Sequence, residues 1–142
     1  MAGQELAVVD ASVVVKWFAR ESYSDKANLL KEAYVKGLID ISAPCILPFE
    51  VLNALKYTYH LGQTELLEVS EALEDFQFDL RSLYEVKEEI VEIASVYGVT
   101  IYDAAYVALG KKLNEVDYTA DEKLVARLKG VDFVKHIRDF SV

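Results

Sequence analysis

An apolar run near the start of the chain, followed at once by a single acid, constrains the fold more than any other feature. Residues 6–9 form a short, continuous, β-prone stretch, which is typical of a strand buried on both faces. Asp10 comes next, and Ser12 offers a hydroxyl that can cap a following helix. Asp10 is therefore predicted at the carboxyl end of a central strand, the edge at which open parallel sheets bind ligands. Because burying a charge costs free energy, we expect Asp10 to have partners.

The rest of the chain alternates predicted strands with predicted helices. Further strands are predicted over residues 38–43, 78–83, 116–119 and 132–134, and helices over residues 24–37, 48–60, 63–76, 87–97, 100–113 and 121–129. This alternation predicts an α/β fold of three layers, with a central, mainly parallel sheet of four to five strands between helices. A length of 142 residues suits one domain, residues 1–142.

The composition argues against several classes of protein and site. No apolar run approaches the roughly 20 residues that span a bilayer, and the first residues lack the basic region of a secretory signal, so we expect a cytoplasmic protein without a membrane segment. The single Cys45 excludes an intrachain disulfide, and we expect it to be buried. His60 and His136 form no recognisable ligand pair, which disfavours a histidine-rich zinc site.

The chain is acidic, with 24 Asp and Glu against 15 Lys and Arg and a net charge of −9. Such a protein is not expected to hold nucleic acid through a broad basic surface. A polyanionic ligand would need a local basic rim or bound cations to reverse the field. The candidates for such a rim are Lys16, Arg20, Lys56, Lys111, Lys112, Lys123 and Arg127, and we favour ordinary solvated helix faces for most of them. Four tyrosines suit packing or, alternatively, base stacking: Tyr57, Tyr59, Tyr102 and Tyr106.

Four acids share one placement in this pattern. Asp10, Glu50, Asp103 and Asp121 each fall just after a predicted strand or in the first turn of a predicted helix. Taken singly, the helical acids have structural explanations, because a first-turn acid complements the helix dipole. Asp10 has no such explanation. The four together predict an acidic cluster at the carboxyl edge of the sheet.

Capping offers a competing interpretation for two of these acids. Thr100 and Asp103 approximate a capping box, and Thr119 with Glu122 makes a better one that would leave Asp121 simply inside the first turn.

Four stretches of the sequence then carry a resemblance. They are VVDASV (8–13), PFEVLNAL (48–55), IYDAAYVAL (101–109) and YTADEKL (118–124). Each alone is a weak signal, but in this order and on these predicted elements they are specific. On them the chain resembles PIN-domain proteins, in particular VapC-type toxin ribonucleases, over nearly its whole length.

The resemblance implies a function and assigns roles to residues. Asp10, Glu50, Asp103 and Asp121 match the acidic catalytic and metal-binding set of the family, with Mg²⁺ or Mn²⁺ as the cofactor, and an adjacent Asp117 or Glu122 could share the role of Asp121. Ser12, Asn53 and Thr119 match its supporting residues. The implied activity is hydrolysis of RNA phosphodiester bonds, and the implied partners are a VapB-type antitoxin that blocks the site and a second copy in a homodimer.

Elementary chemistry agrees with a metal at such a cluster. Carboxylates that face one crevice repel, so their pKa values rise unless a cation binds. Hard divalent cations take oxygen ligands and can activate water and stabilise charge on a phosphate. Asp10 and Asp103 are the principal ligands that we expect. The alternatives are an RNA-processing nuclease of the same fold that is not a toxin, and a non-catalytic interaction module with an acidic pocket.

Overall fold

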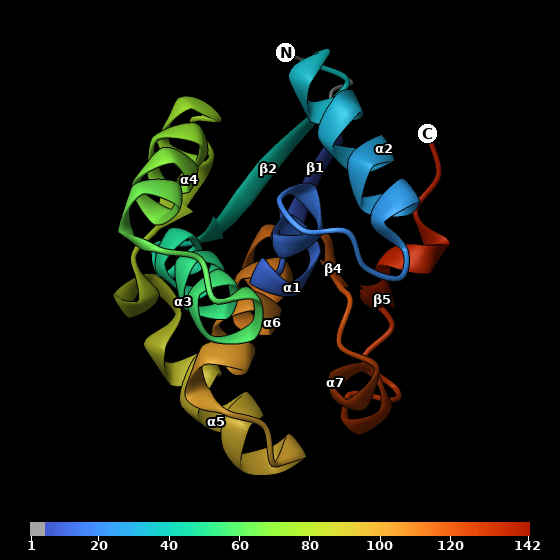
Figure 1. Cartoon of the computed structure of the whole chain (residues 1–142). Helices are drawn as coiled ribbons and strands as arrows, with labels where there is room; N and C mark the ends of the chain where they lie inside the picture. The colour runs from blue at the N-terminus through green and yellow to red at the C-terminus, as the bar shows by residue number, and fades with distance from the viewer. Residues whose placement is uncertain (1–4) are drawn as a thin grey trace.

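A computed structural model describes residues 5–142. Five strands in this part of the chain form one parallel sheet (Figure 1). They are β1 (Glu5–Val9), β2 (Ile39–Pro44), β3 (Asp79–Arg81), β4 (Val116–Thr119) and β5 (Val134–His136), and their order across the sheet is β3-β2-β1-β4-β5. All four pairings between neighbouring strands are parallel. The predicted α/β fold with a central parallel sheet is confirmed, although the last strand begins two residues later than predicted.

Helices lie on both sides of this sheet (Figure 1). They are α1 (Ala11–Val14), α2 (Ser24–Val35), α3 (Leu47–Tyr59), α4 (Gln63–Asp75), α5 (Lys87–Tyr97), α6 (Ile101–Leu113) and α7 (Glu122–Arg127), with short 3₁₀ turns η1 (Val15–Trp17), η2 (Leu83–Val86) and η3 (Ile137–Asp139). Residues 5–142 contain no single helix long and apolar enough to cross a membrane. Residues 83–97 and α6 together have the length and composition of a span, but they are bent by 118° relative to each other.

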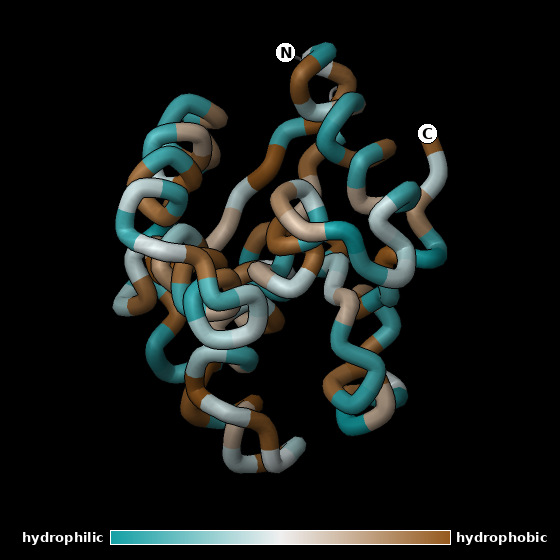
Figure 2. Tube along the Cα trace, in the orientation of Figure 1, coloured by the Kyte–Doolittle hydropathy of each residue, from teal (hydrophilic) through white to brown (hydrophobic). Residues whose placement is uncertain are grey.

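Strand β4 shows how the two faces are covered. Successive side chains of a strand point to opposite faces, and the Tyr118 ring packs edge-on against Phe140 while the neighbouring Asp117 lies against α6. A Cβ atom at Gly110 of α6 would come within 3.2 Å of the Glu115 carbonyl oxygen, so glycine lets the helix approach the strand closely. Figure 2 shows hydrophobic residues in the middle of the molecule and mixed hydropathy along the outer helices.

The strand order fixes where a ligand site can form. From β1 the chain builds the sheet toward β2 and β3, and then returns to add β4 and β5 on the other side of β1. In open α/β sheets, the crevice at the carboxyl ends of the strands where the order reverses is the usual ligand site. Asp10 directly follows β1 and Asp121 closely follows β4, so both lie at this reversal point.

Three local predictions are wrong. Asp10, not Ser12, is the N-cap of α1, and its side chain accepts from the Ser12 backbone N–H. Asp121, not Thr119, is the N-cap of α7. Cys45 is exposed because it follows the last residue of β2, outside the core.

Candidate active site

Asp10 is a buried carboxylate whose hydrogen bonds all fall on one oxygen. Its side chain is only 6% exposed, at the point where β1 gives way to α1. Oδ2 accepts from the Ser12 hydroxyl at 2.5 Å, from the Thr119 hydroxyl at 3.0 Å and from the Ser12 backbone N–H at 3.4 Å. Burial raises the pKa of Asp10, and the nearby charge of Asp103 raises it further, while the donors on Ser12 and Thr119 oppose the rise. These donors stabilise the ionised form.

Ser12 and Thr119 are themselves held by the loop between β4 and α7. The Ala120 backbone N–H donates to Ser12 Oγ at 2.9 Å, and the Asp121 backbone N–H donates to Thr119 Oγ1 at 3.1 Å. Each hydroxyl therefore accepts from the loop and donates to Asp10. This network connects the acid that follows β1 to the acid that follows β4.

Glu50 is held by a residue that sequence reasoning assigned to packing. The buried Tyr106 of α6 donates its phenol O–H to Glu50 Oε1 at 2.6 Å. Burial raises the pKa of Glu50, the Tyr106 hydrogen bond lowers it, and the charges of Asp10 and Asp103 raise it. Tyr106 lies one helical turn after Asp103, and this spacing is the signal that could have placed both side chains on the same face of α6.

Asp103 lies in the first turn of α6, as predicted, whereas Asp121 is the N-cap of α7. The Asp103 backbone N–H donates to the Thr100 hydroxyl at 3.0 Å, which confirms Thr100 as the cap of α6. Burial raises the pKa of Asp103, a hydrogen bond from Thr100 opposes this, and the charge of Asp121 adds to the rise. Asp121 Oδ1 accepts from the Leu124 N–H at 3.1 Å. Both acids thus combine a capping geometry with a shared electrostatic environment.

The two residues that could replace Asp121 lie in opposite environments. Glu122 is exposed and pairs with Arg138 at 2.7 Å, away from the other acids. Asp117 is completely buried under α6, and neither carboxyl oxygen has a hydrogen-bond partner within residues 5–142. Burial, followed by the charges of Asp10 and Asp103, raises the pKa of Asp117 well above its ordinary range. A buried carboxyl group without donors is expected to be neutral.

A divalent cation fits these residues in one particular way. Over residues 5–142, no group of three or more His, Cys, Asp or Glu side chains is arranged so that it could hold a metal ion by itself. However, the hydrogen bonds to Asp10 occupy Oδ2 and leave Oδ1 without a donor in the same part of the chain. Mg²⁺ is commonly held by one or two carboxylates, with water and substrate phosphate completing its shell. The donor set therefore suits Mg²⁺ better than it suits a metal that needs a complete protein cage.

Two hollows adjoin the acids. The first, of about 200 Å³, is lined by Asp103 and Asp121 together with the cations Lys123 and Arg127. The second, of about 370 Å³, is lined by Ile46, Phe49, Glu50, Asn53 and Tyr102. We call them the basic hollow and the aromatic hollow.

Other predicted residues lie outside the acidic centre. Lys16 is buried and pairs with Glu21 at 3.1 Å, so its ammonium group already has a partner inside the fold. The amide of Asn53 is exposed and makes no hydrogen bond within residues 5–142, so its supporting role stays a prediction.

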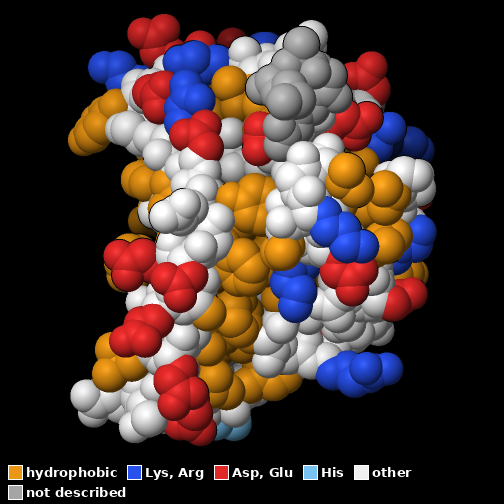
Figure 3. All heavy atoms as spheres, turned by 90° about the horizontal axis from the view of Figure 1, so that it is seen from above, with side chains coloured by type: hydrophobic (Ala, Val, Ile, Leu, Met, Phe, Trp, Pro, Cys, Tyr) orange, Lys and Arg blue, Asp and Glu red, His pale blue; other side chains and the backbone are white. Residues whose placement is uncertain are grey.

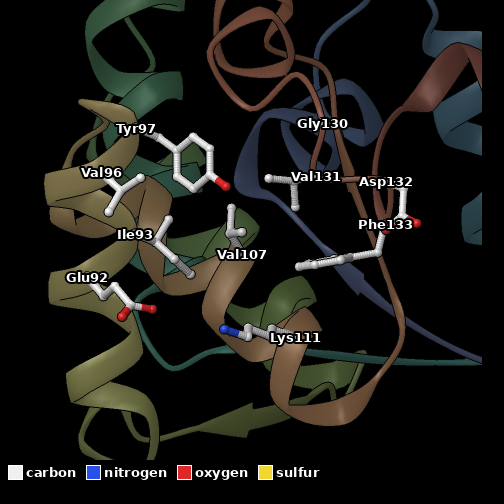
Figure 4. Close-up of a pocket in the computed structure, with 10 residues that line it drawn as sticks. All are labelled: Glu92, Ile93, Val96, Tyr97, Val107, Lys111, Gly130, Val131, Asp132 and Phe133. Atoms are coloured by element: carbon white, nitrogen blue, oxygen red, sulfur yellow. The ribbon is translucent and has the colours of Figure 1, made fainter.

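A third hollow, of about 300 Å³, lies at the other end of α6 (Figure 4). Side chains of α5 and α6 and of residues 130–133 line it, including Tyr97, Val107 and Phe133. Lys111 is the one predicted phosphate contact among its lining residues, and it lies eight residues after Asp103, about 12 Å along the helix. This hollow is therefore separate from the acidic centre.

A parallel sheet with acids gathered at its reversal point agrees with the family comparison. A family model for the PIN domain matches residues 7–130. The chain belongs to the PIN-domain family.

Individual relatives agree with this assignment and with the resemblance to VapC-type proteins. Ribonuclease VapC3 from Pyrobaculum aerophilum is 31% identical over 126 residues, which span 84% of this chain and 92% of that protein. A chain of a toxin–antitoxin complex from Klebsiella pneumoniae has a TM-score of 0.66 at 18% identity, covering 96% of this chain and 99% of that one. A crystal structure of a protein from Pyrobaculum aerophilum has a TM-score of 0.61 at 23% identity, and the match covers 95% of this chain and 92% of that one. At these identities, the two structures show the fold alone.

Proposed function

We propose that this protein is an endoribonuclease that depends on Mg²⁺ or Mn²⁺ and is the toxin of a VapBC-type pair. The observation that carries the proposal is Asp10, a buried carboxylate with one oxygen fixed by two hydroxyls and the other left without a donor. The charge of Asp103 acts on Asp10, and the charges of both act on Glu50, which supports a centre that would bind a cation. The similarity to Ribonuclease VapC3 supports RNA as the substrate.

The chain's own residues have distinct roles in this proposal. Asp10 and Asp103 would hold the cation, and Glu50 and Asp121 would complete the shell or orient a water molecule. Ser12 and Thr119 would favour the ionised form of Asp10 against the effect of burial and fix the direction of its Oδ2. When bound, Mg²⁺ would supply positive charge to the phosphate that is attacked.

The basic hollow supports binding of a polyanion by an acidic protein. Lys123 and Arg127 are one turn apart on α7 and line the same hollow as Asp103 and Asp121. Arg127 Nη1 donates to the Gly98 carbonyl oxygen at 2.7 Å, and this hydrogen bond positions the guanidinium group. We propose that these two cations bind an RNA phosphate next to the cleaved one, by direct charge-assisted hydrogen bonds.

An antitoxin and a second copy of the chain are the proposed protein partners. The Klebsiella pneumoniae complex supports an antitoxin. Figure 3 looks from the side on which β1 begins, opposite to the acids, and shows a strip of hydrophobic side chains with acidic side chains along one edge and basic ones along the other. The VapB-type antitoxin that we propose would block the site at the opposite edge of the sheet, where the acids lie. Sedimentation equilibrium tests the homodimer.

Cleavage of single-stranded RNA with and without Mg²⁺ tests the enzymatic proposal. We expect cleavage that stops in EDTA and in Asp103→Asn. The matched control is Asp25→Asn, since Asp25 is also a first-turn acid, on α2, but is exposed and lines neither hollow beside the acids. Cleavage that persists in EDTA and in Asp103→Asn would contradict the proposal.

Expression in cells separates a toxin from a processing nuclease. A toxin should arrest growth, and co-expression of the product of a neighbouring small gene should restore it. Growth that continues despite an active enzyme would favour the processing nuclease.

A further inference from the structure

We infer that the aromatic hollow beside Glu50 is a subsite for one nucleobase of the RNA, on a nucleotide that flanks the cleaved phosphate. The inference rests on the proposed ribonuclease function and adds where a base is bound. Phe49 and Tyr102 are the residues that would bind it, by stacking.

The hollow has the chemistry of a base-binding site. Phe49 and Tyr102 are 72% and 56% exposed, although large aromatic side chains are usually covered. They come from different helices, α3 and α6, and line one hollow with Ile46. Aromatic faces stack on any base, and a volume of about 370 Å³ lies in the range of small-ligand sites.

The sequence ties each ring to a catalytic acid. Phe49 immediately precedes Glu50, and Tyr102 immediately precedes Asp103. Neighbouring residues on a helix point about 100° apart, so an acid can face the centre while the ring beside it faces the hollow. A base in this hollow would therefore belong to a nucleotide next to the phosphate at the acids.

Each of the two hollows is lined by one residue at the start of α6. Asp103 lines the basic hollow and Tyr102 lines the aromatic hollow. An RNA strand that crosses the acidic centre would thus meet cations suited to a phosphate on one side and rings suited to a base on the other. A single strand presents these groups in alternation.

A nucleobase fits the surface better than a protein partner does. The apolar part of the hollow consists of three side chains, Ile46, Phe49 and Tyr102. A stable protein interface buries about 800 Å² on each partner, far more than these side chains offer. Glu50 also lines the hollow, and a protein partner that covered the hollow would have to bury this carboxylate, which costs free energy unless the partner pairs it.

The test is a cycle between the protein and the substrate. The wild-type protein is first used with Mg²⁺ to map one cleavage position in a short RNA, and the bases around that position are then removed one at a time as abasic sites. We expect one flanking abasic site to raise KM by about 5- to 150-fold with little change in kcat. The double variant Phe49→Ala/Tyr102→Ala should show the same rise in KM on intact RNA and no further rise on the abasic RNA.

Two variants serve as controls. Tyr84→Ala removes a ring that is 83% exposed on η2, outside the hollow, and should leave KM and the effect of the abasic site unchanged. Tyr102→Phe keeps the ring and should retain the wild-type KM.

Several results would overturn the inference. If the wild type cleaves RNA and the double variant has the same KM, the inference is wrong and the ribonuclease proposal stands. The same conclusion follows if an abasic site raises KM equally in both proteins. A change of mass in the double variant, seen by sedimentation equilibrium, would assign the rings to an interface between copies instead. A wild-type protein that does not cleave RNA would overturn both proposals.

Discussion

Two buried aspartates on neighbouring strands have opposite surroundings. Asp10 follows β1 and receives hydrogen bonds from Ser12 and Thr119 on one oxygen. Asp117 lies on β4 beside Val8 of β1, and neither of its oxygens has a donor among residues 5–142. Burial raises the pKa of both groups, but only at Asp10 do hydrogen bonds oppose the rise.

The difference distinguishes an acid that is suited to bind a cation, Asp10, from a buried acid that is not, Asp117. Hydrogen bonds to an ionised carboxylate stabilise its charge and fix its direction. Asp10 receives them at the carboxyl edge of the sheet, whereas Asp117 lies within β4 and is buried beneath α6. This contrast supports Asp10 as the proposed metal ligand, and we expect Asp117 to stay neutral and outside the reaction.

The largest expected effect is the loss of activity in Asp10→Asn. Removing the charge removes the proposed principal ligand, so the cleavage rate should fall by more than about 100-fold, beyond the usual effect of changing a supporting residue. Asp117→Asn should change the rate by less than about tenfold. RNA cleavage at saturating Mg²⁺ measures both, and equal losses would show that burial alone, not hydrogen bonding, marks the catalytic acid.

The next effect concerns the donors to Asp10. Thr119→Val keeps the shape of the side chain but removes the hydroxyl, so the Mg²⁺ concentration at half-maximal rate should rise by about 10- to 100-fold. Ser82→Ala removes a hydroxyl that only caps η2, and it should leave that concentration unchanged. If Thr119→Val has the same Mg²⁺ dependence as the wild type, the Thr119 hydroxyl does not support metal binding by Asp10.

A smaller effect is a dependence of stability on pH in EDTA. An acid whose pKa is higher in the folded state than its ordinary value of 3.8 binds more protons when folded. The free energy of unfolding should therefore fall as the pH rises from about 4 toward the raised pKa, by up to about 1.4 kcal/mol per pH unit for each such group. Thermal unfolding at pH 5 and pH 8 measures this.

Two comparisons sharpen the pH experiment. Asp117→Asn should make the slope shallower because it removes one titrating group, and Mg²⁺ should restore stability at pH 8 by binding the ionised acids. Because the lowered pKa of His136 acts in the opposite direction, an equally steep pH dependence in wild type and Asp117→Asn, not the sign of the slope alone, would contradict the raised pKa of Asp117.

The smallest effect is expected in Tyr106→Phe. The phenol hydrogen bond lowers the pKa of Glu50, so its loss should raise that pKa and move the acid limb of the pH–rate profile upward by about one unit. The plateau rate should fall by less than tenfold. A profile identical to that of the wild type would show that Glu50 does not need to ionise.

The sheet and the positions of the acids could be predicted from the sequence because both are local patterns. The apolar run before Asp10 specifies a buried strand, and first-turn acids follow helix starts. The partners of these acids could not be predicted in the same way. Thr119 is 109 residues from Asp10, and its hydroxyl serves that acid instead of capping α7.

Tyr106 and Asp117 illustrate the same limit. The hydrophobic periodicity of the sequence does not indicate which residues a buried tyrosine or a strand aspartate contacts. Only packing of α6 on the sheet brings Tyr106 to Glu50 and seals Asp117 from donors. Long-range contacts therefore decide which of several plausible acids is functional.

Direct binding of Mn²⁺ tests the central claim most simply. Electron paramagnetic resonance counts free Mn²⁺ as the ion is added to wild-type protein, Asp10→Asn and Asp117→Asn. The account predicts saturable binding by the wild type and by Asp117→Asn, and binding weakened by at least about tenfold in Asp10→Asn. Equal binding by wild type and Asp10→Asn, or loss of binding only in Asp117→Asn, would contradict it.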